Sequence, residues 1–347
     1  MTEQMTALAE NYPAAAELLR RHGGETLLSY LGQLRHRPLP DILPSEELLD
    51  EVLDYFTPFF GAETAGECAD VLRRRRCLST ANHHHPAFEY MTVQDTILCD
   101  QWLRLQGETG AVVPFLSCAN PRLDNNVYPR GMLVYDCTAP GGCLRLPFYP
   151  FKLRHACVAA VEGISPDMVD NALNRLRQET RRGTHFFWGL DRRAALFPLR
   201  LRESAGTAAL TGQNSLGEAV TVPLTPQALT EGLRDGSLLP GLFLCFLEAH
   251  FLRDFTVFGG FYQPTYLAEM RRGLVRALRE TGGYEEEAAI IEAKRNEMTL
   301  GLIYLLRSRE GGRFPVSTAE LLEQPVSTPE VEASLQGSVA AALEHLN

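Results

Sequence analysis

The chain has 347 residues, of which 45% are hydrophobic and 22% charged, and its formal net charge at pH 7 is −10. This composition is typical of a globular protein with one large domain or two ordinary ones. The acidic balance argues against general nucleic-acid binding, because contacts to phosphate backbones need a basic surface. We find no secretory signal and no apolar stretch long enough to span a bilayer, and we therefore expect a cytoplasmic protein without membrane contact.

The eight cysteines are scattered along the chain without a Cys-x-x-Cys pair. Cys99, Cys157 and Cys245 stand among apolar residues, where a free thiol behaves as a small hydrophobic side chain. This usage favours a reduced compartment and buried thiols over a disulfide framework.

The first 75 residues are predicted to be helical. Apolar residues at three- and four-residue spacing predict helices over 14–19 and 26–31, and Ser45 is suited to cap a third helix over 46–56. We interpret residues 1–75 as an N-terminal helical segment that packs on the core.

The next part of the chain has the order strand, helix, strand. A short apolar run begins at Cys77, and Thr92 with Asp95 resembles a capping box that starts a helix. A second apolar run covers 111–118, and Pro114 places the strand at or after that position. This order is that of a βαβ unit with parallel strands.

Further elements are predicted after this unit. We expect a strand over 132–135, a turn at Gly141-Gly142, a helix capped by Ser165, and a β-rich segment over 196–224. From 226 onward the pattern is helical, with a buried helix over 242–258, amphipathic helices over 265–280 and 285–307, and two short helices after Gly311. The predicted fold is therefore α/β, with a Rossmann-like, mostly parallel sheet core in 76–225 flanked by helical segments in 1–75 and 226–347.

The sequence of residues 77–85, Cys-Leu-Ser-Thr-Ala-Asn-His-His-His, carries most of the functional information. If the strands are parallel, the three histidines lie at the carboxyl end of the first strand. The polar loop 119–126 follows the second strand and should lie at the same sheet edge, where open α/β sheets bind ligands.

One hypothesis treats this edge as an anion site. Histidines before a helix N-terminus can bind phosphate or carboxylate together with backbone N–H groups, and nearby arginines supply charge. The candidate catalytic residues are His83, His84, His85 and Asp124. The candidate substrate-binding residues are Asn82, Gln94, Asn120, Arg122, Asn125, Asn126, Arg130 and Gln263.

Two alternatives stay open. In an extended backbone His83 and His85 project to one side and could bind a divalent metal ion, as in a metal-dependent hydrolase. Completing ligands would come from Asp124, His155, His185 or His250. In the other alternative His84 packs structurally and the protein is a non-catalytic small-molecule binding or assembly protein.

The leading hypothesis is an enzyme of group-transfer or ligation type that acts on a small, polar, anionic or phosphorylated metabolite. Neither G-x-G-x-x-G nor G-x-x-x-x-G-K-[ST] occurs, which argues against a dinucleotide fingerprint or a P-loop. The sequence identifies neither the substrate nor the cofactor, for which a divalent metal ion and a nucleotide are both open.

Overall fold

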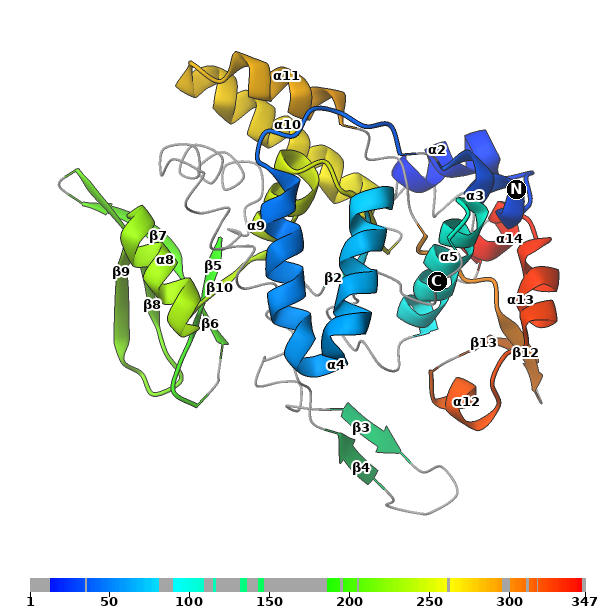
Figure 1. Cartoon of the computed structure of the whole chain (residues 1–347). Helices are drawn as coiled ribbons and strands as arrows, with labels where there is room; N and C mark the ends of the chain where they lie inside the picture. Colours follow the sequence, from blue (N-terminus) through cyan, green and yellow to red (C-terminus); the bar gives the residue numbers. More distant parts are fainter. Residues whose placement is uncertain are drawn as a thin grey trace.

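The computed structural model describes most of the chain outside the segment from 109 to 185. The described residues are 13–34, 36–80, 90–108, 115–116, 132–135, 143–146, 186–193, 196–204, 206–260, 263–294, 300–309, 312–316 and 318–344. Helices and strands are both present (Figure 1), and three of the strands form a small parallel sheet.

The N-terminal segment is helical, as predicted. It contains α2 (Pro13–His22), α3 (Leu27–Gln33) and α4 (Ser45–Arg75). Thr26 caps α3, and its side chain accepts a hydrogen bond from the Ser29 N–H at 3.1 Å. Helix α4 is longer than the predicted 46–56 because the chain continues through a bend at Gly61 (φ 81°), which produces two neighbouring helical arms (Figure 1).

The predicted parallel strand pair is confirmed. Strand β1 (Cys77–Thr80) pairs in parallel with β2 (Phe115–Leu116), and α5 (Tyr90–Leu105) lies between them in the chain. A third strand, β11 (Thr256–Phe258), pairs in parallel with β1 on its other side, which gives the order β11-β1-β2. The predicted helix start at Thr92 is wrong, because α5 begins at Tyr90 and Thr92 lies inside its first turn.

Both faces of this sheet are covered by apolar side chains. Leu78 and Val257 are register partners and belong to a core formed with α4 and α10 (Gln263–Thr281). Cys77 and Phe258 belong to a second core, which includes α5 and the N- and C-terminal helices. Parallel sheets are characteristically buried on both faces, and this sheet follows that rule.

Antiparallel strands form the remaining sheets. Strands β5 (Phe187–Leu190), β6 (Leu196–Pro198) and β10 (Leu238–Pro240) have the order β10-β5-β6. Strands β7 (Arg200–Ser204), β8 (Thr207–Gln213) and β9 (Ala219–Pro223) form a meander, so the predicted β-rich segment over 196–224 is confirmed. Strands β3 (Met132–Tyr135) and β4 (Cys143–Leu146) also pair antiparallel, as predicted on either side of Gly141-Gly142. The sheet of β7–β9 is followed by α8 (Pro226–Asp235).

The predicted helix over 242–258 is wrong in its second half. Helix α9 (Leu242–Phe246) continues as a π-helical turn, η2 (Leu247–Leu252), and the chain then becomes β11. Continuous apolar runs do not distinguish a buried helix from a buried strand. The same segment therefore supplies both a buried helix and a strand of the parallel sheet.

The C-terminal region also differs from the prediction after α10. Helix α11 (Glu285–Ala293) ends well before 307, and β12 (Leu306–Arg309) pairs with β13 (Gly312–Pro315). Three short helices follow instead of two: α12 (Thr318–Glu323), α13 (Thr328–Leu335) and α14 (Val339–Glu344). The predicted helix at Ser165 lies outside the described residues.

Candidate functional site

The three parallel strands direct the chain toward one edge of the sheet, which we call the carboxyl edge. The chain leaves β1 at Thr80, β2 at Leu116 and β11 at Phe258. Because the strands are parallel and adjacent, these three carboxyl ends lie on the same side of the sheet. The three segments with predicted functional residues, 81–85, 117–126 and 259–263, follow directly from these ends.

Most of the predicted site residues lie outside the described residues. This group contains Asn82, His83, His84, His85, Asn120, Arg122, Asp124, Asn125, Asn126 and Arg130, together with the metal-ligand candidates His155 and His185. Gln94 and Gln263 are described, and both side chains are fully buried.

Gln94 supports the carboxyl edge through main-chain contacts. Its Oε1 accepts hydrogen bonds from the N–H groups of Tyr304 (2.8 Å) and Leu305 (2.9 Å), and its Nε2 donates to the Leu305 carbonyl at 3.1 Å. This side chain therefore holds residues 304–305 against α5. The bonds also explain why no helix continues to 307, since the backbone here bonds to a side chain of another element.

Gln263 has a comparable place at the end of β11. Its Nε2 donates to the Val257 carbonyl at 2.6 Å, and its Oε1 accepts from the Tyr266 hydroxyl at 3.4 Å. The contact ties the start of α10 to β11. Gln94 and Gln263 thus both support the edge through backbone contacts, and their contact with a substrate stays a prediction.

Two buried hydroxyl groups have unused hydrogen-bonding capacity. Ser79 lies next to the last residue of β1, and its Oγ has no hydrogen-bond partner among the described residues. The Tyr304 hydroxyl has none there either, and burial raises the pKa of this phenol well above its ordinary value. Tyr304 belongs to segment 300–305, whose Gly301 N–H donates to the Gly259 carbonyl at 3.0 Å just beyond β11. Unpaired buried polar groups are uncommon and call for an explanation.

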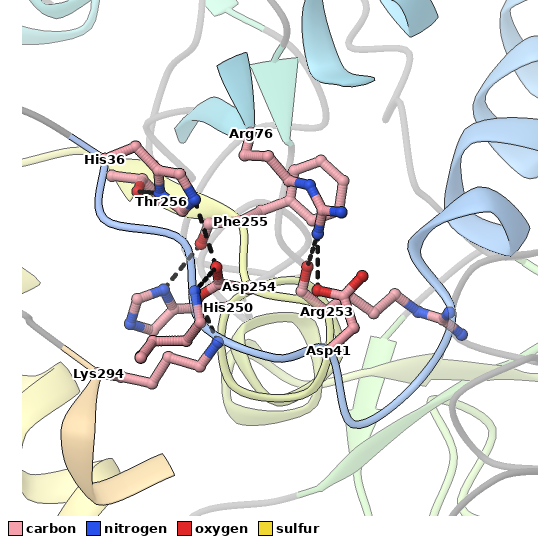
Figure 2. A network of polar contacts seen from close by, with 10 residues as sticks. His36, Asp41, Arg76, His250, Arg253, Asp254, Phe255, Thr256 and Lys294 are labelled. Atoms are coloured by element: carbon pink, nitrogen blue, oxygen red, sulfur yellow. Dashed lines mark hydrogen bonds and ion pairs between the residues drawn. The ribbon is translucent and has the colours of Figure 1, made fainter. Parts of the chain in front are cut away.

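The opposite edge of the sheet carries a cluster of charged side chains that the sequence did not reveal. We call it the amino-edge cluster and define it as His36, Asp41, Arg76, Asp254 and Lys294 (Figure 2). Arg76 precedes β1 and has a φ of 48°, while Asp254 precedes β11 and has a φ of 54°. Left-handed backbone at residues other than glycine is uncommon and is often found at functional or strained positions.

Asp254 is the centre of this cluster. Its carboxylate accepts hydrogen bonds from the Leu39 N–H at 2.8 Å and from the Lys294 ammonium, and it lies 3.3 Å from His36 Nε2. The other ring nitrogen of His36, Nδ1, lies 2.8 Å from Thr256 Oγ1. Burial opposes ionisation of Asp254, but the contacts with His36, Leu39 and Lys294 outweigh it and hold the pKa of Asp254 below its ordinary value. Burial lowers the pKa of Lys294 despite this partner.

A second group of contacts continues from Arg76 to the end of segment 36–47. Arg76 donates to Asp41 at 2.7 Å and to the Arg253 carbonyl at 3.1 Å (Figure 2). Arg253 is fully buried and contacts Glu248, the Pro44 carbonyl and, at 2.9 Å, Glu47. The charges of this edge thus pair with one another and fasten segment 36–47 to the start of the sheet, which indicates a structural role.

One sequence signal could have located this cluster. Arg253 and Asp254 are adjacent charged residues inside the mostly apolar run 242–258, which also contains Glu248 and His250, and buried charges require partners. The predicted helix over 242–258 would place His250 and Asp254, four residues apart, on one helix face, but the helical turns end at Leu252. His250 Nδ1 instead lies 2.8 Å from the Phe255 carbonyl.

The described part of the chain contains no group of three His, Cys, Asp or Glu side chains placed to hold a metal ion. The thiols of Cys68, Cys77, Cys99 and Cys245 are buried and form no disulfide bonds, as predicted for Cys99 and Cys245.

With this geometry established, we compared the chain with known proteins. No family model, curated protein or solved structure matches it. Among the described residues, no helix is both long and apolar enough to cross a bilayer. The functional argument therefore depends on the residues and the sheet alone.

Proposed function

We propose that the protein is an enzyme that binds a small, polar, anionic or phosphorylated metabolite at the carboxyl edge of a Rossmann-like sheet. The observation that carries the proposal is the parallel order β11-β1-β2. It supports a common site because the histidine run and the Asn/Asp/Arg loop follow adjacent strands that end on one side. Ligands of open α/β sheets bind in the crevice outside the carboxyl ends of the strands.

In this proposal the residues have distinct tasks. A histidine from 83–85 acts as general acid/base or stabilises phosphate charge. Asn120, Asp124 and Asn125 orient the substrate, and Arg122 and Arg130 bind its negative charge. The reaction is group transfer or ligation.

A thermal-shift screen with nucleotides, sugar phosphates and amino acids tests the proposal. A ligand at a hundred times its Kd stabilises the folded state by about 2.7 kcal/mol, which a melting curve resolves. We expect His83→Ala and Arg122→Ala to remove the shift produced by a phosphorylated or carboxylated ligand. The matched controls are His22→Ala in α2 and Arg192→Ala, an exposed arginine between β5 and β6, which should retain it.

The same variants distinguish the anion site from a ligand site elsewhere and from a metal-dependent hydrolase. A shift that survives both His83→Ala and Arg122→Ala would place the ligand elsewhere and contradict the proposal. A stoichiometric divalent ion in untagged protein that is lost in a His83→Ala, His85→Ala variant would replace the anion site by a metal-dependent hydrolase.

A further inference from the structure

A cavity of about 400 Å³ is bordered by helices α10 and α11. Its volume falls within the range of small-molecule sites. Figure 1 shows α10 and α11 packed side by side at one end of the molecule. The lining residues are Arg271, Arg272, Val275, Arg276, Arg279 and Glu280 from α10 and Glu292 from α11.

The lining is positively charged although the whole chain is acidic. Four arginines face two glutamates in the lining, whereas the chain has a net charge of −10. Arg272, Arg276 and Arg279 have the spacing i, i+4, i+7 and therefore share one face of α10 over about 10 Å of its length. Like charges at this spacing repel one another, and a bound anion would relieve the repulsion.

The carboxylates near the cavity neutralise only part of this charge. Glu292 pairs with Arg279 at 2.6 Å, and Glu269 pairs with Arg272. Arg271 donates to the main-chain carbonyl of Lys294, the residue that follows α11. Arg276 and Glu280 are also engaged in contacts. Among the described residues no carboxylate lies within 4.0 Å of the Arg271 guanidinium, although its charge helps to lower the pKa of Glu292. The carbonyl contact orients the guanidinium of this lining residue, which lowers the entropy lost when it binds an anion.

The arrangement favours an extended anion over a single small ion. Guanidinium groups placed about one helical turn apart present a row of donors in planar forks, the geometry that suits phosphate oxygens. We propose that the α10–α11 cavity binds an oligophosphate chain, either free or as part of a nucleotide. The proposal is independent of the function proposed for the carboxyl edge, because it uses none of those residues.

Isothermal titration calorimetry on the full chain at 0.15 M NaCl tests this site, with inorganic triphosphate and metal-free ATP as separate probes. We expect saturable binding of triphosphate that weakens as salt rises. The double variant Arg272→Gln, Arg276→Gln should lower the affinity at least tenfold. Comparable affinities for both probes would assign recognition to the phosphate chain, and tighter binding of ATP would assign it to a nucleotide.

The control double variant Arg192→Gln, Arg193→Gln removes the same charge from an exposed turn and should bind within twofold of the parent. Both double variants change exposed side chains, and circular dichroism verifies their folding. Absence of triphosphate binding in the parent, or an equal loss in both double variants, would overturn the proposal. Loss in His83→Ala without loss in the α10 variant would also overturn it, because the probe would then occupy the carboxyl edge.

Discussion

At the scale of single residues, Asp254 connects the amino edge of the parallel sheet to segment 36–47 and to Lys294. Its backbone has a φ of 54°, a conformation that costs free energy for a residue with a Cβ. The carboxylate offsets this cost by binding a main-chain N–H of segment 36–47 and the ammonium of buried Lys294. The same side chain thus connects three parts of the chain that are distant in sequence.

Replacement of Asp254 by Asn should be strongly destabilising at neutral pH. The substitution leaves the Lys294 ammonium buried without its counter-ion, and breaking such a pair costs about 3–5 kcal/mol. Urea unfolding at pH 7 measures the loss. Asp70→Asn, at an exposed carboxylate on α4 that pairs with Arg73 at 2.8 Å, should change the free energy of unfolding by less than about 1 kcal/mol.

The effect of Asp254→Asn should depend on pH. The pKa of Asp254 is lowered in the folded state, so its stabilising contribution is complete above the unfolded-state pKa. The contribution is lost as pH falls through the folded-state value. The free energies of unfolding of parent and variant should therefore converge in acid. A difference that stays constant from pH 7 to pH 2 would contradict this account of the cluster.

Glu248 should show the opposite pH dependence. Burial raises the pKa of this carboxyl to about 7, against the opposing effect of Arg253. The folded state therefore binds a proton that the unfolded state releases near its ordinary pKa of 4.5. The contribution of Glu248 to the free energy of unfolding is greatest below that value. It falls as pH rises to about 7, by a total of about 3 kcal/mol. Urea unfolding from pH 4 to pH 8 should show a free energy of unfolding that falls with pH in the parent and falls less in Glu248→Gln. Equal slopes in the two proteins would contradict the raised pKa of Glu248.

At the scale of elements, the sequence pattern was informative where hydrophobic periodicity and turn residues agreed. Strand β1, the β1-α5-β2 order, the start of β2 after Pro114 and the strands on either side of Gly141-Gly142 follow from such patterns. The pattern failed at 242–258, because an apolar run has no period that separates helix from strand. It also failed at 300–307, where Gln94 binds the backbone of Tyr304 and Leu305, within a segment whose sequence pattern is helical.

The bend of α4 depends on the backbone conformation of Gly61, which a substitution can test. Its φ of 81° requires a residue without a Cβ, although nothing lies within 4 Å of the position where a Cβ would stand. Gly61→Ala should therefore destabilise the protein by about 1–2 kcal/mol through backbone strain alone. Gly66→Ala, in the same helix and equally open, should instead stabilise it by up to about 1 kcal/mol. Thermal unfolding of the two variants measures the contrast, and two changes of the same sign would contradict the strain argument.

At the scale of the whole molecule, the parallel sheet separates two kinds of polar residue. The charges at its amino edge pair with one another and fasten segment 36–47 (Figure 2). The polar residues that follow its carboxyl edge are those that the sequence alone identified as chemically informative. The sequence predicts the carboxyl edge because the order strand, helix, strand indicates two parallel strands, and parallel neighbours end on the same side of a sheet. For the amino-edge cluster the sequence offered only the adjacent charges Arg253 and Asp254, which indicate that buried charges need partners. It could not name those partners, which are brought together only by tertiary contacts.

The third strand strengthens the argument for one common site. From the sequence, Gln263 is a substrate-binding candidate with no reason to place it beside the histidines. The pairing of β11 with β1 brings its carboxyl end next to theirs. Gln94 and Gln263, which the sequence predicts as substrate ligands, both bind backbone groups, since a buried amide is stabilised by pairing with nearby peptide groups.

The central claim, that the histidine run binds an anion at the carboxyl edge, is tested most directly by nuclear magnetic resonance. Inorganic phosphate is titrated into protein with ¹⁵N-labelled histidines, whose ring signals are assigned through single His→Gln variants. We predict that the ring signals of His83, His84 or His85 shift and saturate with phosphate while that of His22 stays fixed. Arg122→Ala should raise the Kd at least tenfold. Ring signals of all three that remain unchanged at saturating phosphate would contradict the claim.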